Sequence, residues 1–169
     1  MHRLTVDEFK ASSKLPLVVV LDNVRSLHNV GSVLRSCDAF RVEAVYLCGI
    51  TATPPSAEIH KTALGAEDSV TWKYFAETTD AVDELHANAT KVLAVEQVAG
   101  STMLQNMETN EGQRYAVVLG NEVKGVQQAV VDCCDGCLEI PQFGTKHSLN
   151  VSVAAGIVVW EFAKKIGNK

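Results

Sequence analysis

The sequence lacks any apolar run long enough to cross a membrane and any recognisable signal peptide. Its most apolar late segment, residues 149–159, is far shorter than the roughly 18 residues that a membrane-spanning helix requires. Residues 1–14 contain no apolar core of signal-peptide length. The five cysteines form no even framework of the kind that disulfide-rich secreted proteins use. We therefore expect a cytoplasmic protein without membrane contact.

Net positive charge is also missing. The chain of 169 residues has a formal net charge of −5, whereas proteins that hold nucleic acid by charge alone are strongly basic. Any nucleic-acid site must therefore be a local patch on an acidic body. Apolar residues make up 47% of the chain and charged residues 21%, a composition that excludes disorder and is typical of a globular domain.

The fingerprints of common nucleotide and metal sites are absent or incomplete. The chain contains no G-x-G-x-x-G motif. Gly120 and Gly125 have the glycine spacing of a phosphate loop, but residues 126–127 (VQ) stand where lysine and serine or threonine are required. ATP and NAD are therefore disfavoured. Cys134 and Cys137 form a single C-x-x-C pair without further ligands, so we interpret them as structural and expect no metal.

What the sequence does contain is an alternation of strand and helix patterns. Apolar or β-branched runs predict strands at residues 17–21, 44–48, 70–75, 91–95, 115–119 and 137–140. Helical spacing predicts helices at residues 29–40, 57–64, 80–88, 126–131 and 150–164. The alternation indicates an α/β fold with a mostly parallel sheet flanked by helices. Thr5-x-x-Glu8 is a capping-box pattern. We expect residues 1–16 to form a short N-terminal helical extension and residues 17–169 a single domain.

The first unusual segment is residues 29–35 (NVGSVLR), where a helix is predicted to begin after the first strand. Asn29 is a suitable N-cap, and the start of a helix can attract an anion such as a phosphate. Arg35 is a charged residue on an otherwise apolar helix. Taken alone, the segment is equally compatible with a capped helix that carries one surface arginine.

Two further unusual segments also follow predicted strands. Residues 119–125 (LGNEVKG) place two glycines around polar residues, so the backbone there can approach a ligand closely. Residues 140–152 (IPQFGTKHSLNVS) lead from a strand into the last helix, for which Ser148 and Asn150 are possible caps. Ligands of parallel α/β sheets bind outside the carboxyl ends of the strands. We therefore predict that function resides in these loops.

Together and in this order, the three segments resemble the motifs of the SpoU (TrmH-like) branch of the SPOUT RNA methyltransferases. The matching patterns are N-x-G-[SA]-x-x-R, L-G-N-E-x-x-G and I-P…S-L-N-V-[SA]-x-A, and the likeness extends over residues 17–163. It implies a C-terminal trefoil knot in the α/β fold and S-adenosylmethionine (S-adenosyl-L-methionine) as the cofactor. It also implies a homodimer that completes each site and methylation of a ribose 2′-hydroxyl in RNA.

The resemblance assigns roles to individual residues. Arg35 would activate the hydroxyl, with Asn29, Glu122, Ser148 and Asn150 in supporting roles. The cofactor would be held by Val95, Glu96, Gly120, Asn121, Ile140 and Leu149. No metal is implied.

The role of Arg35 has two interpretations. A guanidinium stays protonated under ordinary conditions, so Arg35 could act as a base only with strong help. It could equally clamp the phosphate beside the target ribose. The local basic patch that an acidic protein needs for RNA would consist of Arg25, Arg41, Lys124 and Lys146.

Two alternative functions remain open at this point. One is an RNA- or cofactor-binding protein on the same fold without catalysis, which would not need to retain Asn29, Arg35 and Glu122. The other is an unrelated doubly wound nucleotide-binding protein. Within the methyltransferase hypothesis we favour tRNA over rRNA. The surroundings of the first motif favour a guanosine in the tRNA D-arm, and we expect the core surface and the dimer to recognise the RNA.

Overall fold

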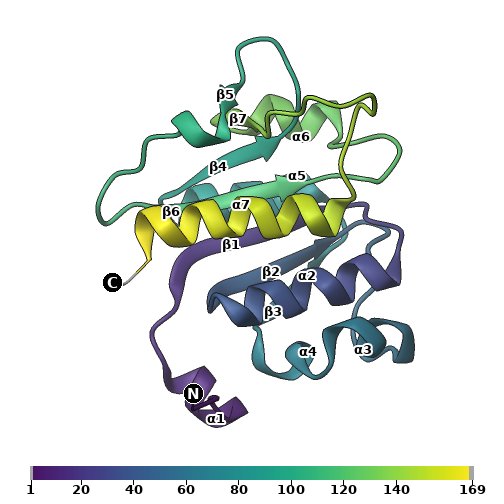
Figure 1. The fold of residues 1–169 in the computed structure, drawn as a ribbon, viewed down its shortest axis with the longest axis vertical. Helices are drawn as coiled ribbons and strands as arrows, with labels where there is room; N and C mark the ends of the chain where they lie inside the picture. Colours follow the sequence, from purple (N-terminus) through teal and green to yellow (C-terminus); the bar gives the residue numbers. More distant parts are fainter. Residues whose placement is uncertain (1, 168–169) are drawn as a thin grey trace.

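In the computed structural model, which describes residues 2–167, parallel strands form one seven-stranded sheet between two layers of helices (Figure 1). The strand order is β3-β2-β1-β6-β4-β7-β5, and every pairing is parallel. The strands are β1 (Leu15–Asp22), β2 (Val42–Cys48), β3 (Trp72–Phe75), β4 (Thr90–Val95), β5 (Thr102–Met103), β6 (Arg114–Leu119) and β7 (Gly136–Glu139). The α-helices are α1 (Val6–Ala11), α2 (Leu27–Ala39), α3 (Ala57–Ala63), α4 (Ala66–Ser69), α5 (Thr78–Ala87), α6 (Gln128–Cys133) and α7 (Val151–Ile166), with a 3-10 turn η1 (Leu104–Asn106). The predicted α/β fold is thus confirmed.

The continuous apolar runs form strands because the sheet is covered on both faces. In β1, Leu17, Val19 and Leu21 point into one core, and Val18 and Val20 point into the other. All five side chains are fully buried. Side chains alternate between the two faces of a strand, so a strand buried on both sides must be apolar at every position.

Each face of the sheet has its own pair of helices. The larger core packs beneath α2 and α7, and α7 crosses the front of the sheet over β6 and β1 in Figure 1. On this face Phe162 of α7 lies against Tyr115 of β6, with ring centroids 5.4 Å apart. The smaller core lies beneath α5 and α6 on the opposite face. The helix α7 therefore returns to the N-terminal strand β1 after the chain has passed through β7.

Two predicted helices need correction: the helix predicted at residues 126–131 lies two residues later, as α6, and α2 begins earlier than predicted. Ser26, and not Asn29, is the N-cap of α2, because its side-chain oxygen accepts a hydrogen bond from the Asn29 backbone N–H at 3.2 Å. Leu27 packs against the core and extends the helix by part of a turn. The capping box at Thr5 and Glu8 is present as predicted, and Asn150 caps α7. Strand β5, helix α4 and the turn η1 were not predicted.

The order in which the strands are added reverses at β1, so the loops at the carboxyl ends of the strands lie on both sides of this strand. From β1 the chain steps outward to β2 and β3, and it then returns to build β4, β6 and β7 on the other side of β1. Loops after strands on both sides of this reversal can enclose a ligand.

Within residues 2–167, the structure contains no helix with the length and hydropathy of a membrane span.

Candidate functional site

A cavity of about 280 Å³ opens at the carboxyl ends of β4, β6 and β7. Its wall comes from the end of β4, the loop after β6, the end of β7 with the loop that follows it, and the first turn of α7. The residues predicted to hold a cofactor all line this one cavity: Val95, Glu96, Gly120, Asn121, Ile140 and Leu149. Three segments of the sequence, at residues 95–96, 120–121 and 140–149, therefore converge on one place, as predicted.

The loop after β6 is closed into a tight ring. Asn121 and Gly125 exchange two backbone hydrogen bonds of 3.0 and 2.9 Å, and Gly125 has a φ of +71°, a conformation that favours glycine. A Cβ on Gly120 would lie 2.1 Å from the Gly125 carbonyl carbon and 2.2 Å from the Val126 nitrogen. The side chain of Glu96 accepts a hydrogen bond from the Val126 N–H at 2.5 Å and fixes the ring to the end of β4.

Glu122 projects from this ring to the start of α2. Its carboxylate accepts hydrogen bonds from the backbone N–H groups of Arg25 and Ser26, at 3.1 and 3.0 Å, and from the Asn29 amide at 3.3 Å. Partial burial raises the pKa of the Glu122 carboxyl, but these donors outweigh the burial and leave the pKa below its usual value. Glu122 is thus an ionised anchor whose oxygens are occupied, which makes it a poor general base.

The first and third motifs meet at the same point. The Asn150 side chain donates a hydrogen bond to the Asn29 side-chain oxygen at 3.3 Å. Its own oxygen accepts from the backbone N–H groups of Ser152 and Val153 and so caps α7. Asn29, Glu122 and Asn150 therefore form one polar cluster beside the cavity, and Ser148 lines the cavity itself.

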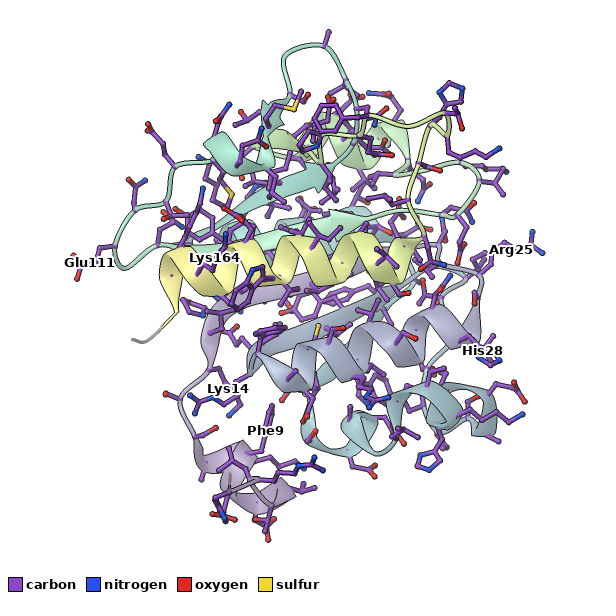
Figure 2. All side chains as sticks on the ribbon, in the orientation of Figure 1. Phe9, Lys14, Arg25, His28, Glu111 and Lys164 are labelled. Carbon is purple, nitrogen blue, oxygen red and sulfur yellow. The ribbon has the colours of Figure 1, made fainter. Side chains whose placement is uncertain are left out.

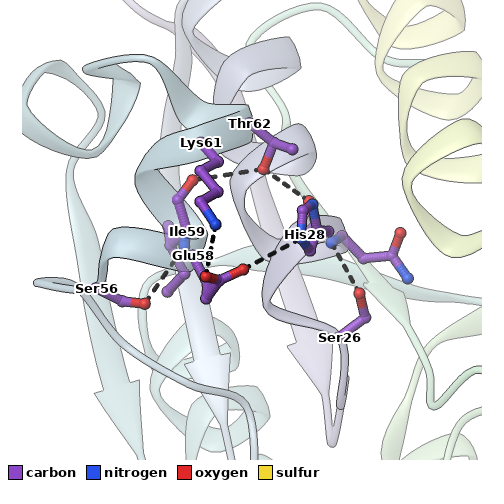
Figure 3. A network of polar contacts seen from close by, with 8 residues as sticks. Ser26, His28, Ser56, Glu58, Ile59, Lys61 and Thr62 are labelled. Atoms are coloured by element: carbon purple, nitrogen blue, oxygen red, sulfur yellow. Dashed lines mark hydrogen bonds and ion pairs between the residues drawn. The ribbon is translucent and has the colours of Figure 1, made fainter.

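The start of α2 is also held from its other side by α3 (Figure 3). The Thr62 hydroxyl donates to the His28 carbonyl at 2.9 Å, and Glu58 bridges His28 and Lys61 at 3.3 and 2.8 Å. Gly31 is needed for this approach, because a Cβ there would lie 2.0 Å from the Thr62 hydroxyl oxygen. The glycine of the first motif thus serves close helix packing and not a ligand.

Arg35 is the one predicted catalytic residue that belongs neither to the cavity wall nor to the polar cluster of Asn29, Glu122 and Asn150. It is exposed on α2, and it is neither part of the cavity wall nor bonded to Glu122. Six residues of helix place it about 9 Å along and about 120° around the axis from Asn29. In a single chain, the arginine and the cavity are therefore separate features.

The predicted RNA-binding residues divide into two groups. Lys124 is exposed in the loop after β6, Lys146 precedes the cavity residue His147, and Arg25 lies beside Glu122. The Arg25 side chain extends away from the body of the protein in Figure 2. Arg41 lies at the other end of α2, between this helix and β2, so the structure does not bring it together with the other three.

The cysteine pair shows no metal site. Among residues 2–167, no three side chains of histidine, cysteine, aspartate or glutamate are grouped as a metal ion would need, and all five cysteines are free thiols. Burial raises the pKa of the Cys134 thiol to about 12, so it stays protonated and unreactive near neutral pH.

Asp22 is a buried residue that supports the site from behind, and the sequence reasoning missed it. It is fully buried at the end of β1, and it accepts hydrogen bonds from the Thr78 hydroxyl at 2.6 Å and from the Gln127 backbone and side chain at 2.8 Å each. It thereby fixes Gln127, which follows the ring after β6, to the end of β1. An acidic residue directly after a continuous apolar strand was the available indication in the sequence.

We predict that Asp22→Ala lowers the free energy of unfolding by about 2–4 kcal/mol, because it leaves buried donors without an acceptor. Urea denaturation followed by circular dichroism measures this loss. Asp83→Ala is the matched control, since Asp83 is exposed on α5. A change below about 0.5 kcal/mol for the Asp22 variant would contradict the anchoring role.

Comparison with known proteins gives one consistent result. The model of the SpoU rRNA Methylase family matches residues 16–160. The 23S rRNA (guanosine-2'-O-)-methyltransferase RlmB of Shewanella oneidensis is 32% identical over 160 residues, which are 95% of this chain and 64% of that protein. A putative TrmH family tRNA/rRNA methyltransferase of Staphylococcus aureus is 31% identical over 156 residues, which are 92% of this chain and 62% of that protein. The chain thus spans slightly less than two thirds of the length of these relatives.

Solved structures agree with the fold. The AdoMet-bound rRNA methyltransferase from Sinorhizobium meliloti superposes with a TM-score of 0.81 at 27% identity, covering 90% of this chain and 60% of that one. The A. aeolicus TrmH/SpoU tRNA modifying enzyme superposes with a TM-score of 0.82 at 24% identity, covering 95% and 81%.

Proposed function

Because the chain belongs to the SpoU rRNA methylase family, we propose that it transfers the methyl group of S-adenosylmethionine to a ribose 2′-hydroxyl of RNA. The observation that carries the proposal is the convergence of the three motifs. The loops of the second and third motifs line one cavity at the ends of β4, β6 and β7. Asn29 of the first motif joins them through side-chain hydrogen bonds with Glu122 and Asn150. The arrangement unites a ligand pocket with polar groups held in fixed positions beside it.

The composition of the cavity fits this cofactor. Leu119, Leu138 and Leu149 offer apolar surface for a planar adenine ring, and Glu96 and Glu139 place carboxylates in the wall of a site that takes a cationic ligand. When bound, S-adenosylmethionine supplies a methyl group attached to a sulfonium, and the neutral thioether is the leaving group. The protein therefore has no need of a metal, and its residues have only to align the hydroxyl and assist the loss of its proton.

We propose a homodimer in which Arg35 acts on the cavity of the other subunit. In one chain, Arg35 is exposed on α2 and is not part of the cavity wall, so a single subunit presents an incomplete site. Next to α2, helix α7 exposes Val153, Ile157 and Trp160, whose side chains are 51%, 38% and 52% accessible. Residues spaced by four and three positions lie on one face of a helix, and a large exposed apolar face is typical of an interface. A second copy that covers this face would bring its own Arg35 toward the cavity.

Arg35 is proposed to engage the phosphate beside the target ribose or to assist the loss of the hydroxyl proton. A guanidinium is an obligate donor and forms bidentate contacts with phosphate, which supports the first role. Asn29 and Asn150 hold the adjoining ends of α2 and α7 in register with the cavity through Glu122. Ser148 would line the path of the substrate.

Further parts of the proposal concern the fold and the location. We propose that the segment after β7 is threaded into a trefoil knot, which the return of α7 across the sheet supports. Residues 17–169 would form the methyltransferase domain and residues 1–16 a helical extension whose Phe9 packs into the larger core. With RNA as the substrate, the protein would work in the cytoplasm.

Methyl transfer from tritiated S-adenosylmethionine into bulk tRNA and rRNA tests the function. The RNAs are taken from a strain that lacks the protein, and both are offered because the named relatives include rRNA and tRNA/rRNA enzymes. We expect label in nucleotides that resist alkaline cleavage, because a methylated 2′-oxygen cannot attack the neighbouring phosphate. We favour tRNA, on the likeness of residues 21–40 to the tRNA branch. Cofactor binding without any transfer would indicate the alternative, a non-catalytic binding protein.

A further inference from the structure

Phe143 is exposed to solvent next to a residue of the cavity wall. Its side chain is 95% accessible, and the three aromatic ring pairs within residues 2–167 all involve other residues. A phenylalanine that buries no surface contributes nothing to the stability of the fold. Its neighbour Gln142 lines the cavity, and so do His147 and Ser148 farther along the same loop. The ring therefore lies beside the opening through which a substrate must enter.

Cations without acidic partners lie on the loops that border the same opening. Arg25, Lys124 and Lys146 take part in none of the ion pairs formed within the described residues, whereas Lys61, Lys73, Lys164 and Lys165 are paired with glutamates. Glu122 forms no ion pair with them, and its carboxylate instead accepts hydrogen bonds from backbone N–H groups and Asn29. Val123, on the loop that also carries Lys124, adds a second side chain that is 86% accessible.

An exposed aromatic ring among free cations matches one class of ligand. Proteins hold unpaired nucleotides by stacking bases on aromatic side chains and by placing lysine or arginine on the phosphates. A base inside a duplex is already stacked on both faces and cannot use such a ring. The combination therefore favours an unpaired nucleotide over a double helix.

Building on the proposed function, we propose that Phe143 stacks on an unpaired base of the RNA substrate while Arg25, Lys124 and Lys146 contact the phosphates next to it. The base would be the target nucleotide or its neighbour, held at the rim so that its ribose faces the cavity. Phe143 is thus a positioning residue for RNA and has no contact with the cofactor.

Binding of bulk tRNA to three variants tests the stacking. Phe143→Ala is expected to raise the dissociation constant about tenfold. Phe143→Leu keeps an apolar side chain but no ring and should bind as weakly as the alanine variant, whereas Phe143→Tyr should bind within about twofold of the wild type. Leu4→Ala, which alters an exposed apolar residue at the N-terminus, is the control and should leave binding unchanged.

Salt dependence separates the ring from the cations. Lys146→Gln should reduce the slope of log affinity against log salt by about 0.7, while Phe143→Ala should leave the slope unchanged. A perfect RNA duplex should bind the Phe143→Ala variant as well as it binds the wild type. Calorimetry with S-adenosylmethionine should give the same affinity for all of these variants.

Several results would overturn the stacking role. They are wild-type tRNA affinity in Phe143→Ala, full recovery in Phe143→Leu, or dissociation of the dimer by either substitution. The proposed function fails separately: if the wild type binds tRNA and shows the Phe143 pattern but transfers no methyl group, the stacking surface stands and the enzymatic proposal does not.

Discussion

Replacing Arg35 with alanine is expected to lower methyl transfer by on the order of a hundredfold to ten-thousandfold while cofactor binding and stability stay unchanged. The physical reason is that Arg35 is exposed on α2 and supports neither the core nor the cavity wall. Single-turnover assays with tritiated cofactor measure the rate, and calorimetry with S-adenosylmethionine measures binding. An active Arg35→Ala enzyme would contradict the assignment of this residue.

A mixture of two inactive variants shows in which subunit Arg35 acts. Leu149→Trp is designed to fill the cavity and prevent cofactor binding, since Leu149 lines it. If Arg35 reaches the cavity of the partner subunit, random pairing of Leu149→Trp chains with Arg35→Ala chains restores about a quarter of wild-type activity, because about half of the dimers are mixed and each carries one complete site. If Arg35 acts within its own chain, no mixed dimer has a complete site and the mixture stays inactive.

Gly120→Ala is expected to weaken S-adenosylmethionine binding by on the order of a hundredfold, which corresponds to about 2.7 kcal/mol. The new Cβ would lie 2.1 and 2.2 Å from backbone atoms of Gly125 and Val126, and backbone in a closed ring cannot move aside as the end of a side chain can. The ring must therefore open, and the free energy of unfolding should fall by about 1–3 kcal/mol. Calorimetry and urea denaturation measure the two effects.

Gly144→Ala is the matched control for this substitution. Gly144 lies in the loop after β7, and a Cβ there would meet no atom within 4 Å. The Gly144→Ala variant should bind the cofactor with wild-type affinity. Equal affinities of the Gly120 and Gly144 variants would contradict the close-packed ring.

Strand positions were predictable because burial on both faces leaves little choice of residue. The run at residues 17–21 lies within β1, and that at residues 115–119 lies within β6. Strand β5 has only two residues, Thr102 and Met103, and such a length carries no periodicity that a sequence could reveal. The start of α2 was misplaced because Ser26 and Asn29 are both good caps, and only the packing of Leu27 decides between them.

The cavity was predictable to a greater extent than its surroundings. Motif order and the rule of strand carboxyl ends indicated that Gly120, Ile140 and Leu149 would meet, and they line one cavity. The position of Arg35 depends on which face of α2 packs against the sheet. A count of charges could not show that Arg41 lies far from Arg25, Lys124 and Lys146. Helix α2 has 13 residues, so about 20 Å of helix separates its two ends.

The most direct test of the account is a calorimetric titration of S-adenosylmethionine into the wild type and the Gly120→Ala variant. We predict saturable binding of one molecule per chain to the wild type, competition by S-adenosylhomocysteine but by neither ATP nor NAD, and severe loss of affinity in the variant. Absence of binding to the folded wild type, or undiminished binding to the variant, would contradict the claim that the loops after β4, β6 and β7 together form the methyl-donor site.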